Sequence, residues 1–495
     1  MPDFTDPEHE IICGMIGMGK SYWVLYKIVQ SFLADRPCCY IDPKGDTYRN
    51  LLAFFASTTQ GKQIWERYRH RILLLNPVAV GDYLLAFNAI EPMGEFYFAH
   101  PDRVALLADN LTSHIRRQSG FEMNEAMRMQ NILSAAIGIL VQGGGGQYTL
   151  AELPYLFLPQ REGKEARLYN GFVESLLSRV THYGTSSFWR LQWPTMLPND
   201  RREWVQSSEG RIYPYLFDSR CLMTTCAVEN SRLDFRRVVE EGYWLFVNIP
   251  YGLLSEQITT LIGNFVITKI FYACMQRPPQ GRHYRLILDE ARFFNTGPLD
   301  RILETSRAYH LWLTLVVQSL HQLCRSREGR IDYSLRDTAL NNVRYWSAFN
   351  LTQMEDAETL AKMMFPLTGT EARGLRASGD WDWQPPAVEE EQRARRFMDL
   401  RRREMIFFDK QGSRSPLPCR TPEVVMDAPQ QAMIDLFETQ HLQLTGRPAE
   451  AIMQEIMARK AKVEELIQWK AGTAFPGGED GKPRRLPPAQ IGGVL

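Results

Sequence analysis

The segment Gly14-Met15-Ile16-Gly17-Met18-Gly19-Lys20-Ser21 decides the fold of this 495-residue chain. It matches the pattern G-x-x-x-x-G-K-[S/T], in which glycines let backbone N–H groups turn inward around phosphate oxygens. A short apolar run, residues 9–13, precedes it, and a helical stretch, residues 20–34, follows it. The positive N-terminal end of that helix favours an anion at the same place. Strand, loop and helix in this order make a chance match improbable and predict a nucleotide site.

The roles of the loop residues follow from the pattern. Gly14, Gly17, Met18 and Gly19 are expected to surround the phosphates. Lys20 is expected to reach the β- and γ-phosphates, and the Ser21 hydroxyl to hold Mg²⁺. The predicted cofactors are therefore ATP and Mg²⁺.

A second segment, residues 285–290, is an apolar strand that ends in Asp289 and Glu290. A P-loop enzyme needs one carboxylate to hold Mg²⁺ and a second to polarise the attacking water. We assign the metal role to Asp289 and the hydrolytic role to Glu290. By itself the pair would suggest only a strand that ends in a polar turn, but combined with the loop it predicts ATP hydrolysis.

Two further polar residues are candidates for the same site. Gln318 follows the apolar run 312–317, and strand carboxyl ends are where ligands bind in α/β sheets, so it is a candidate γ-phosphate sensor. The alternative is a polar group that caps the next helix. Arg307 lies between the two strands and is a candidate arginine finger for a neighbouring subunit. Its alternative is a surface pair with Glu304 one turn away, and Arg292 is a weaker finger candidate.

Short apolar runs alternate with helical patterns, which predicts an α/β fold with a mainly parallel sheet. Residues 102–234 lack strand signals and are interpreted as an all-helical insertion. The expected organisation is a first ATPase part, a helical insertion, a second ATPase part, a C-terminal extension with two helices near its end, and a disordered tail. These parts span residues 1–101, 102–234, 235–376, 377–471 and 472–495.

The composition restricts the partners and the compartment. Lys plus Arg equals Asp plus Glu, at 57 each, so any nucleic-acid contact must come from local patches. The eight cysteines include no C-x-x-C pair, which favours reduced thiols over a zinc site. We find no run of about 18 apolar residues and no signal peptide. The expectation is a cytoplasmic protein that does not insert into a membrane directly.

Several basic and aromatic groups have two interpretations. The arginine-rich segment 389–404 could contact phosphates, but its interspersed acids favour a solvated, salt-bridged helix. The arginine pairs at 116–117, 201–202 and 236–237 could line a channel if a ring forms. Trp189, Trp193 and Trp204 could stack on bases, although tryptophans of a helical region more often pack in its core.

Four motifs in order, GMIGMGKS at 14–21, IDPKGD at 41–46, RLILDEARFF at 285–294 and LTLVVQSLHQL at 313–323, resemble the coupling ATPases of conjugation and type IV secretion. These belong to the FtsK–HerA superfamily of ring translocases, and the resemblance covers residues 9–370. It implies a RecA-like P-loop fold, a homohexamer with a central pore, and DNA as cargo. It also implies the roles given above for Lys20, Ser21, Asp289, Glu290 and Gln318, and a trans-acting Arg307.

The chain departs from the conjugative members, which carry N-terminal transmembrane helices, because it begins just before its first strand. We therefore expect a soluble relative that works with a membrane-bound or nuclease partner protein. An alternative function is a protein-handling ATPase that recruits protein substrates without gripping DNA. A third is a scaffold that uses ATP only to close a ring, against which the intact Glu290 argues.

Overall fold

The computed structural model of the protein describes most of the chain, with gaps. The described residues are 7–91, 123–157, 170–229, 233–278, 281–295, 299–327, 330–365, 372–375, 381–383, 386–412, 415–422, 424 and 431–467. The start of the expected helical insertion, residues 102–122 with Arg116 and Arg117, and the expected disordered tail over 472–495 lie outside this set.

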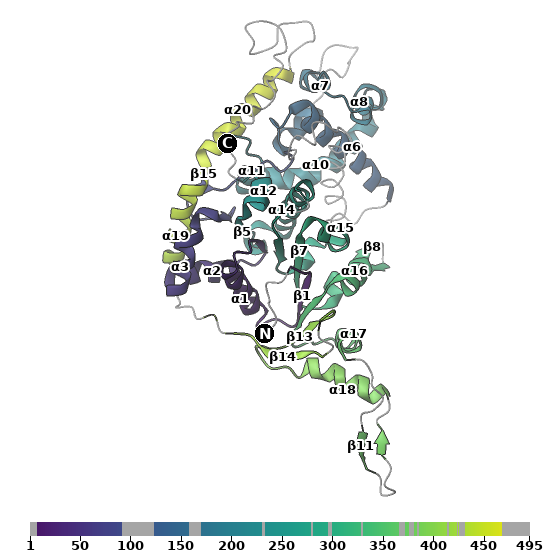
Figure 1. Ribbon diagram of the computed structural model, residues 1–495. Helices are drawn as coiled ribbons and strands as arrows, with labels where there is room; N and C mark the ends of the chain where they lie inside the picture. Colours follow the sequence, from purple (N-terminus) through teal and green to yellow (C-terminus); the bar gives the residue numbers. More distant parts are fainter. Residues whose placement is uncertain are drawn as a thin grey trace.

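A nine-stranded sheet forms the centre of the molecule (Figure 1). Across the sheet the strands are β14 (Leu417–Arg420), β13 (Glu404–Asp409), β10 (Tyr345–Ala348), β1 (Glu10–Cys13), β7 (Leu311–Val317), β6 (Tyr284–Leu288), β2 (Cys38–Asp42), β5 (Trp244–Asn248) and β3 (Ile72–Leu75). The pairs from β10 to β3 are parallel, whereas β13 and β14 add to the β10 edge in antiparallel fashion. The expected α/β fold with a mainly parallel sheet is confirmed.

The parallel strands are almost continuously apolar, as expected for a sheet that helices cover on both faces. All residues of β1, β2, β3, β5 and β7 are buried. Figure 1 shows one group of helices on one side of the sheet, α1 (Lys20–Leu33), α2 (Asp46–Ser57) and α3 (Thr59–Tyr68), and the pair α15 (Leu299–Thr305) and α16 (Ser334–Asn342) on the other. The core therefore lies along the sheet. The loops at the amino ends of the parallel strands, here called the amino edge, and at their carboxyl ends, the carboxyl edge, are available to form sites.

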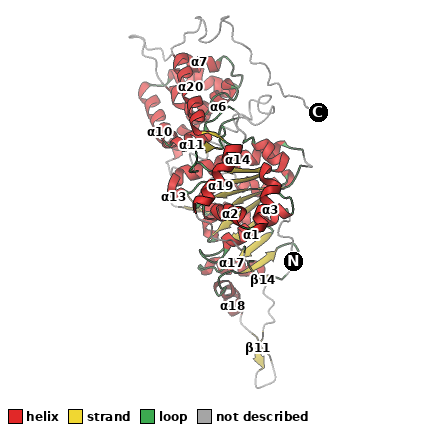
Figure 2. Ribbon diagram, turned by 90° about the vertical axis from the view of Figure 1, so that its left-hand side faces the viewer, coloured by secondary structure: helices red, strands yellow, loops and turns green. Residues whose placement is uncertain are grey.

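The described residues between 123 and 229 are mostly helical. They form the upper end of the molecule in Figures 1 and 2. The helices are α6 (Met123–Gly144), α7 (Gly171–Leu177), α8 (Tyr183–Ser187), α9 (Trp193–Thr195), α10 (Pro198–Phe217) and α11 (Ser219–Thr225), with the 3₁₀ segment η2 (Leu150–Phe157) and a π-helical turn η3 (Phe188–Gln192). Trp189 and Trp193 are buried there, and the Trp189 indole donates to the carbonyl of Ala135 at 3.0 Å. These two tryptophans therefore pack in the core of the helical region, which confirms the second of the two interpretations.

A C-terminal strap, residues 431–467, joins the two ends of the body. Its first helix, α19 (Gln431–Thr445), packs on α2 and β3, and its second, α20 (Ala449–Ile467), packs on α7, η2 and α11. Between them β15 (Arg447–Pro448) pairs with β4 (Tyr83–Leu84). Two helices in this stretch are as expected, but their course along both regions (Figure 1) is not visible in the sequence.

One helix, α14 (Glu256–Gln276), is long and apolar enough to cross a membrane, with a mean hydropathy of 1.5 in its best window. Polar residues such as Asn264 and Lys269 interrupt it, so it is not an unbroken run of about 18 apolar residues of the kind expected to be absent. In the structure 94% of that window is buried, and α14 packs on α12 (Phe235–Arg237) and α11. The helix is apolar all round because protein surrounds it.

Other segments differ from expectation in detail. The helix that Gln318 could have capped is only a 3₁₀ turn, η7 (Leu320–Leu323), followed by the hairpin β8 (Arg325–Arg327) and β9 (Arg330–Asp332). The charged segment 389–404 divides into α18 (Pro386–Met398) and the start of β13. Helix α18 packs on α17 (Met354–Met364), and beyond it the hairpin of β11 (Ala372–Leu375) and β12 (Trp381–Trp383) projects away from the body (Figures 1 and 2).

Candidate nucleotide site

The loop between β1 and α1 has the backbone that its glycines predict. Gly14, Gly17 and Gly19 have φ values of +144°, +80° and +113°, which residues with a Cβ rarely adopt. A Cβ on Gly14 would also lie 2.5 Å from the Cβ of Phe349. The loop is anchored on both sides, because Gly14 N–H donates to Val317 at 3.3 Å and Met15 N–H donates to Asn350 at 2.7 Å.

Lys20 and Ser21 occupy the first turn of α1. The Lys20 side chain is buried and its ammonium turns back into the loop, donating to the carbonyls of Gly14 and, at 3.0 Å, Met15. Burial is the largest cause of a lowered Lys20 pKa. Ser21 is exposed at the same helix end. A cation inside a ring of backbone groups at a helix N-terminus is a suitable receptor for phosphate.

Asp289 lies at the carboxyl end of β6, next to the end of β2. Its carboxylate accepts from the Tyr40 hydroxyl at 3.0 Å and from the Glu290 N–H at 2.9 Å. Burial, followed by the neighbouring charge of Asp42, raises the Asp289 pKa to about 7. Two buried carboxylates side by side repel each other, and a divalent cation would offset that repulsion. The donor set at this edge, Asp289 with the Ser21 hydroxyl, fits the hard oxygen ligands of Mg²⁺.

Glu290 sits in a strained backbone conformation and is fixed by its neighbours. Its φ of 43° and ψ of 57° place it in the left-handed region, where a side chain is tolerated only if the surroundings determine it. Only 3% of the residue is exposed. The Gln318 amide donates to both carboxylate oxygens, at 2.9 and 2.8 Å, and the Lys44 ammonium forms an ion pair with it.

The strand order explains why Gln318 meets Glu290. Strand β7, which ends one residue before Gln318, lies between β1 and β6. The loop after β1 and the acids after β6 therefore flank Gln318 at one sheet edge. The sequence-based candidates Lys20, Asp289, Glu290 and Gln318 all lie at this carboxyl edge.

Lys44 was not among the sequence-based site residues. It belongs to the turn after β2 and to the motif IDPKGD at 41–46, which gave it no individual role. Asp42 fixes that turn, because its carboxylate accepts the N–H groups of Lys44, Gly45 and Tyr48 at 2.9, 2.8 and 2.8 Å. Gly45 has a φ of +86°, and a Cβ there would lie 2.9 Å from Asn248. The only signal in the sequence was Asp-Pro-Lys-Gly-Asp itself, which does not reveal the contact with Glu290.

Arg307 lies elsewhere in the same chain. It is part of the 3₁₀ turn η6 (Ser306–Tyr309), which leads into the amino end of β7, at the opposite edge from the loop. Its guanidinium pairs with Glu8 at 2.6 Å and not with Glu304. Arg292 lies nearer the site, with its Nε 3.7 Å from the Glu290 carboxylate.

Several of the other basic candidates are engaged in local ion pairs. Arg236 and Arg237 pair with Glu240 and Glu241 at 2.9 and 2.7 Å on the surface. In α18 the exposed Arg395 pairs with Glu391 at 2.7 Å, in line with the solvated, salt-bridged interpretation. Arg393 differs, because it is buried with Glu389.

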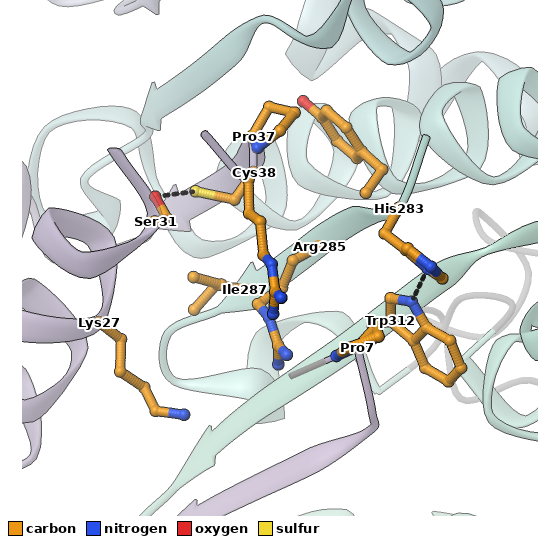
Figure 3. A pocket seen from close by; sticks show the side chains of 11 residues that line it. Pro7, Lys27, Ser31, Pro37, Cys38, His283, Arg285, Ile287 and Trp312 are labelled. Atoms are coloured by element: carbon orange, nitrogen blue, oxygen red, sulfur yellow. Dashed lines mark hydrogen bonds between the residues drawn. The ribbon is translucent and has the colours of Figure 1, made fainter. Parts of the chain in front are cut away.

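A small cavity at the amino edge, between α1 and the starts of β2, β6 and β7, is shown in Figure 3. Lys27, Arg285, His283 and Trp312 are among its lining residues, and the Trp312 indole donates to His283 at 2.9 Å. Its volume is about 30 Å³, which is room for about one water molecule. It is too small for a nucleotide and lies at the edge opposite Lys20.

Comparisons with known proteins support the fold. No protein-family model matches the sequence, and no curated protein matches it. Among solved structures, the unbound monoclinic form of the bacterial conjugative coupling protein TrwBdeltaN70 is similar, with a TM-score of 0.59 and 14% identity over 87% of this chain and 89% of that one. The plasmid coupling protein TrwB with the non-hydrolysable GTP analogue GDPNP gives 0.57 and 16%, over 87% and 89%. TrwB with ADP and Mg²⁺ gives 0.56 and 14%, over 88% and 89%.

Proposed function

We propose that this chain, which has the fold of the conjugative coupling protein TrwB, is a Mg²⁺-dependent ATPase. The observation that carries the proposal is the convergence of Lys20, Asp289, Glu290 and Gln318 at one sheet edge. Three of the similar TrwB structures hold a nucleotide: ADP with Mg²⁺, GDPNP or ADPNP. Their low identity means that the assignment depends on this chain's own residues.

Each residue has a distinct task in the proposed reaction. Lys20 and the N–H groups of the Gly14–Ser21 loop would bind the phosphates, with Gly14, Gly17, Met18 and Gly19 shaping the loop. Ser21 and Asp289 would hold Mg²⁺, which when bound neutralises charge on the transferring phosphoryl group. Glu290 would orient the attacking water and accept its proton. Gln318, which donates to Glu290, would report the presence of the γ-phosphate to η7.

We further propose that the ATPase is a ring, most simply a hexamer, that moves DNA through a central pore. The structural match to TrwBdeltaN70, a conjugative coupling protein, covers 87% of this chain and 89% of that one. The similarity therefore includes the helical region as well as the sheet. The test is steady-state ATP turnover with and without single- and double-stranded DNA at two salt concentrations. Stimulation that weakens with salt is expected for a motor that grips phosphates.

In such a ring Arg307 would act in trans. It lies at the amino edge of its own chain, with 46% of its side chain exposed, and would have to leave Glu8 to reach a neighbour's nucleotide. The test mixes Lys20→Ala subunits, which lack the phosphate ligand, with Arg307→Ala subunits. If Arg307 acts in trans, the mixture forms some intact sites and turns over faster than either variant alone. No gain on mixing, with mixed rings verified, would contradict a trans role.

A second candidate function is the handling of protein substrates. The helical region exposes large apolar side chains, with Tyr183 and Phe217 each 81% exposed and Leu197 67% exposed. Exposed apolar groups of this size suit protein contacts better than phosphates. ATP turnover that ignores both forms of DNA but responds to a partner protein would favour this function. Absence of turnover at high protein concentration would instead favour a scaffold that only binds ATP.

A further inference from the structure

Lys44 lies at the reacting end of the site, although the proposed function gives it no task. Its ammonium contacts the Glu290 carboxylate, and 29% of its side chain is exposed, against 4% for Glu290. Its positive charge also acts on Lys20, where it adds to the effect of burial in lowering the pKa. Two lysines, from loops after different strands, therefore flank one space at the carboxyl edge.

The backbone of Lys44 is held firmly while its side chain can move. Asp42 is fully buried and accepts three N–H groups of this turn, and Gly45 closes it with a positive φ. Since the turn is fixed, the base of the Lys44 side chain stays in place. The half-exposed stem has four rotatable bonds and is able to carry the ammonium to a nearby acceptor.

Glu290 is engaged by two donors in the structure. Gln318 donates to both its oxygens, and Lys44 pairs with one of them. With its two oxygens held by Gln318 and Lys44, the carboxylate has little room to accept a hydrogen bond from an attacking water. A triphosphate carries more negative charge than a carboxylate, so its terminal group is the stronger partner for the ammonium.

We propose that Lys44 is a ligand of the γ-phosphate, exchanged between Glu290 and the nucleotide. This inference rests on the proposed ATPase function. When ATP binds, the Lys44 ammonium moves to a γ-phosphate oxygen and frees Glu290. The water oxygen then forms its bond to the γ-phosphorus while the bond from that phosphorus to the β–γ bridging oxygen breaks. ADP leaves with that electron pair, and the water proton goes to Glu290.

The experiment compares nucleotides that differ by the γ-phosphate. Affinities for ADP and for the non-hydrolysable analogue ADPNP are measured with Mg²⁺ on full-length wild type, Lys44→Ala and Lys44→Arg, together with ATP turnover. For Lys44→Ala we expect ADPNP to bind about tenfold more weakly, since one charge-assisted bond is lost. ADP affinity should stay within about twofold of wild type, and kcat should fall at least about tenfold. Lys44→Arg should recover part of both losses, because it keeps the charge.

The control and the contrary outcomes are distinct. Lys62→Ala removes an exposed lysine of α3 and should change none of these values. Equal weakening for ADP and ADPNP, or no change in either, would overturn the role of Lys44 as a γ-phosphate ligand. A wild-type protein that neither binds nor hydrolyses ATP would overturn the proposed function itself, so the two failures are distinguishable.

Discussion

The two edges of the central sheet differ in how their charges are arranged. At the amino edge, charges occur in groups of opposite sign: the buried pair of Lys27 with Glu10 at 2.5 Å, and the partly exposed Arg344 with Glu8 at 3.2 Å and with Asp409 at 2.8 Å. At the carboxyl edge, the carboxylates of Asp42 and Asp289 are buried beside each other, and Glu290, which follows Asp289 just after β6, adopts a left-handed backbone.

The difference indicates which end of the strands carries the functional site in a sheet of this type. Opposite charges that satisfy each other contribute to stability and leave nothing for a ligand. Like charges that are buried together, next to a strained residue, cost stability and are retained where a ligand or cation completes them. Substitutions at the carboxyl edge should therefore affect turnover, and those at the amino edge should affect unfolding.

The largest effect is expected from Glu290→Gln at the carboxyl edge. Removal of a positioned proton acceptor costs about a thousandfold in turnover, or about 4 kcal/mol of transition-state stabilisation. ATP binding should persist, because the amide keeps the shape and Lys20 is untouched. Steady-state turnover and nucleotide binding are measured on one preparation, with Glu304→Gln, at an exposed position of α15, as the matched control. Wild-type turnover in Glu290→Gln would remove its assigned role.

A somewhat smaller effect, on stability alone, is expected from Lys27→Met at the amino edge. It leaves the buried Glu10 carboxylate with Arg285, 3.8 Å away, as its remaining cationic neighbour, which destabilises by about 3 kcal/mol. The double variant Lys27→Met/Glu10→Gln should recover much of the loss, because the buried carboxylate charge is removed together with that of Lys27. Denaturant unfolding measures both. Arg395→Met, which breaks an exposed pair in α18, should cost less than about 1 kcal/mol.

Turnover per folded molecule is the readout that sharpens this contrast. It should match wild type in Lys27→Met when assayed well below the unfolding midpoint. A large fall in turnover with intact stability would mean that the amino edge takes part in the chemistry.

The smallest effect is a pH dependence that arises from His9. This histidine is fully buried, and burial, with the charges of Arg307 and Arg285, lowers its pKa from 6.5 to about 3. Below pH 6.5 His9 binds a proton in the unfolded chain but stays neutral in the folded chain. The contribution of His9 to the free energy of unfolding is thus complete above pH 6.5 and is lost as the pH falls toward 3. The loss is at most about 1.4 kcal/mol per pH unit, or about 2 kcal/mol at pH 5.

His9→Asn tests this dependence, because its amide oxygen can replace the Nδ1 atom that accepts from Leu313 N–H at 3.0 Å. The difference in unfolding free energy between pH 7 and pH 5 should shrink by that amount in the variant. His70→Gln, an exposed histidine, should leave the difference unchanged. An identical pH profile in His9→Asn and wild type would show that His9 is not the source.

Local patterns in the sequence were sufficient for the elements that build the sheet. The apolar runs at 38–42 and 312–317 appear as β2 and β7 because a strand covered on both faces needs no polar alternation. The glycines at 14, 17 and 19 indicate a positive-φ loop by themselves. Gln318 could be placed near Glu290 because successive strand ends share an edge in a parallel sheet.

Contacts between distant segments were beyond the reach of such patterns. Lys44 and Glu290 are 246 positions apart, and only the adjacency of β2 and β6 brings them together. Arg307 pairs with Glu8 across 299 positions, so the local pairing with Glu304 was the wrong alternative. Residues 405–409 were expected to form a last strand or hairpin, and β13 with β14 confirms this, but the antiparallel pairing of β13 with β10 could not be read from the pattern.

The C-terminal strap has a consequence for the order of events during synthesis. The buried carboxylate of Glu438 accepts from Tyr48 at 2.5 Å and from Asn76 at 2.7 Å, and Arg459 contacts Glu152 at 3.1 Å. These partners emerge from the ribosome hundreds of residues before the strap does. A nascent chain therefore holds its sheet and its helical region before the strap is made, joined by direct contacts such as those of α14 with α11. A chain truncated before residue 431 should keep these direct contacts and lose the hydrogen bonds and ion pair of the strap, so it should unfold at a lower denaturant concentration than the full-length chain.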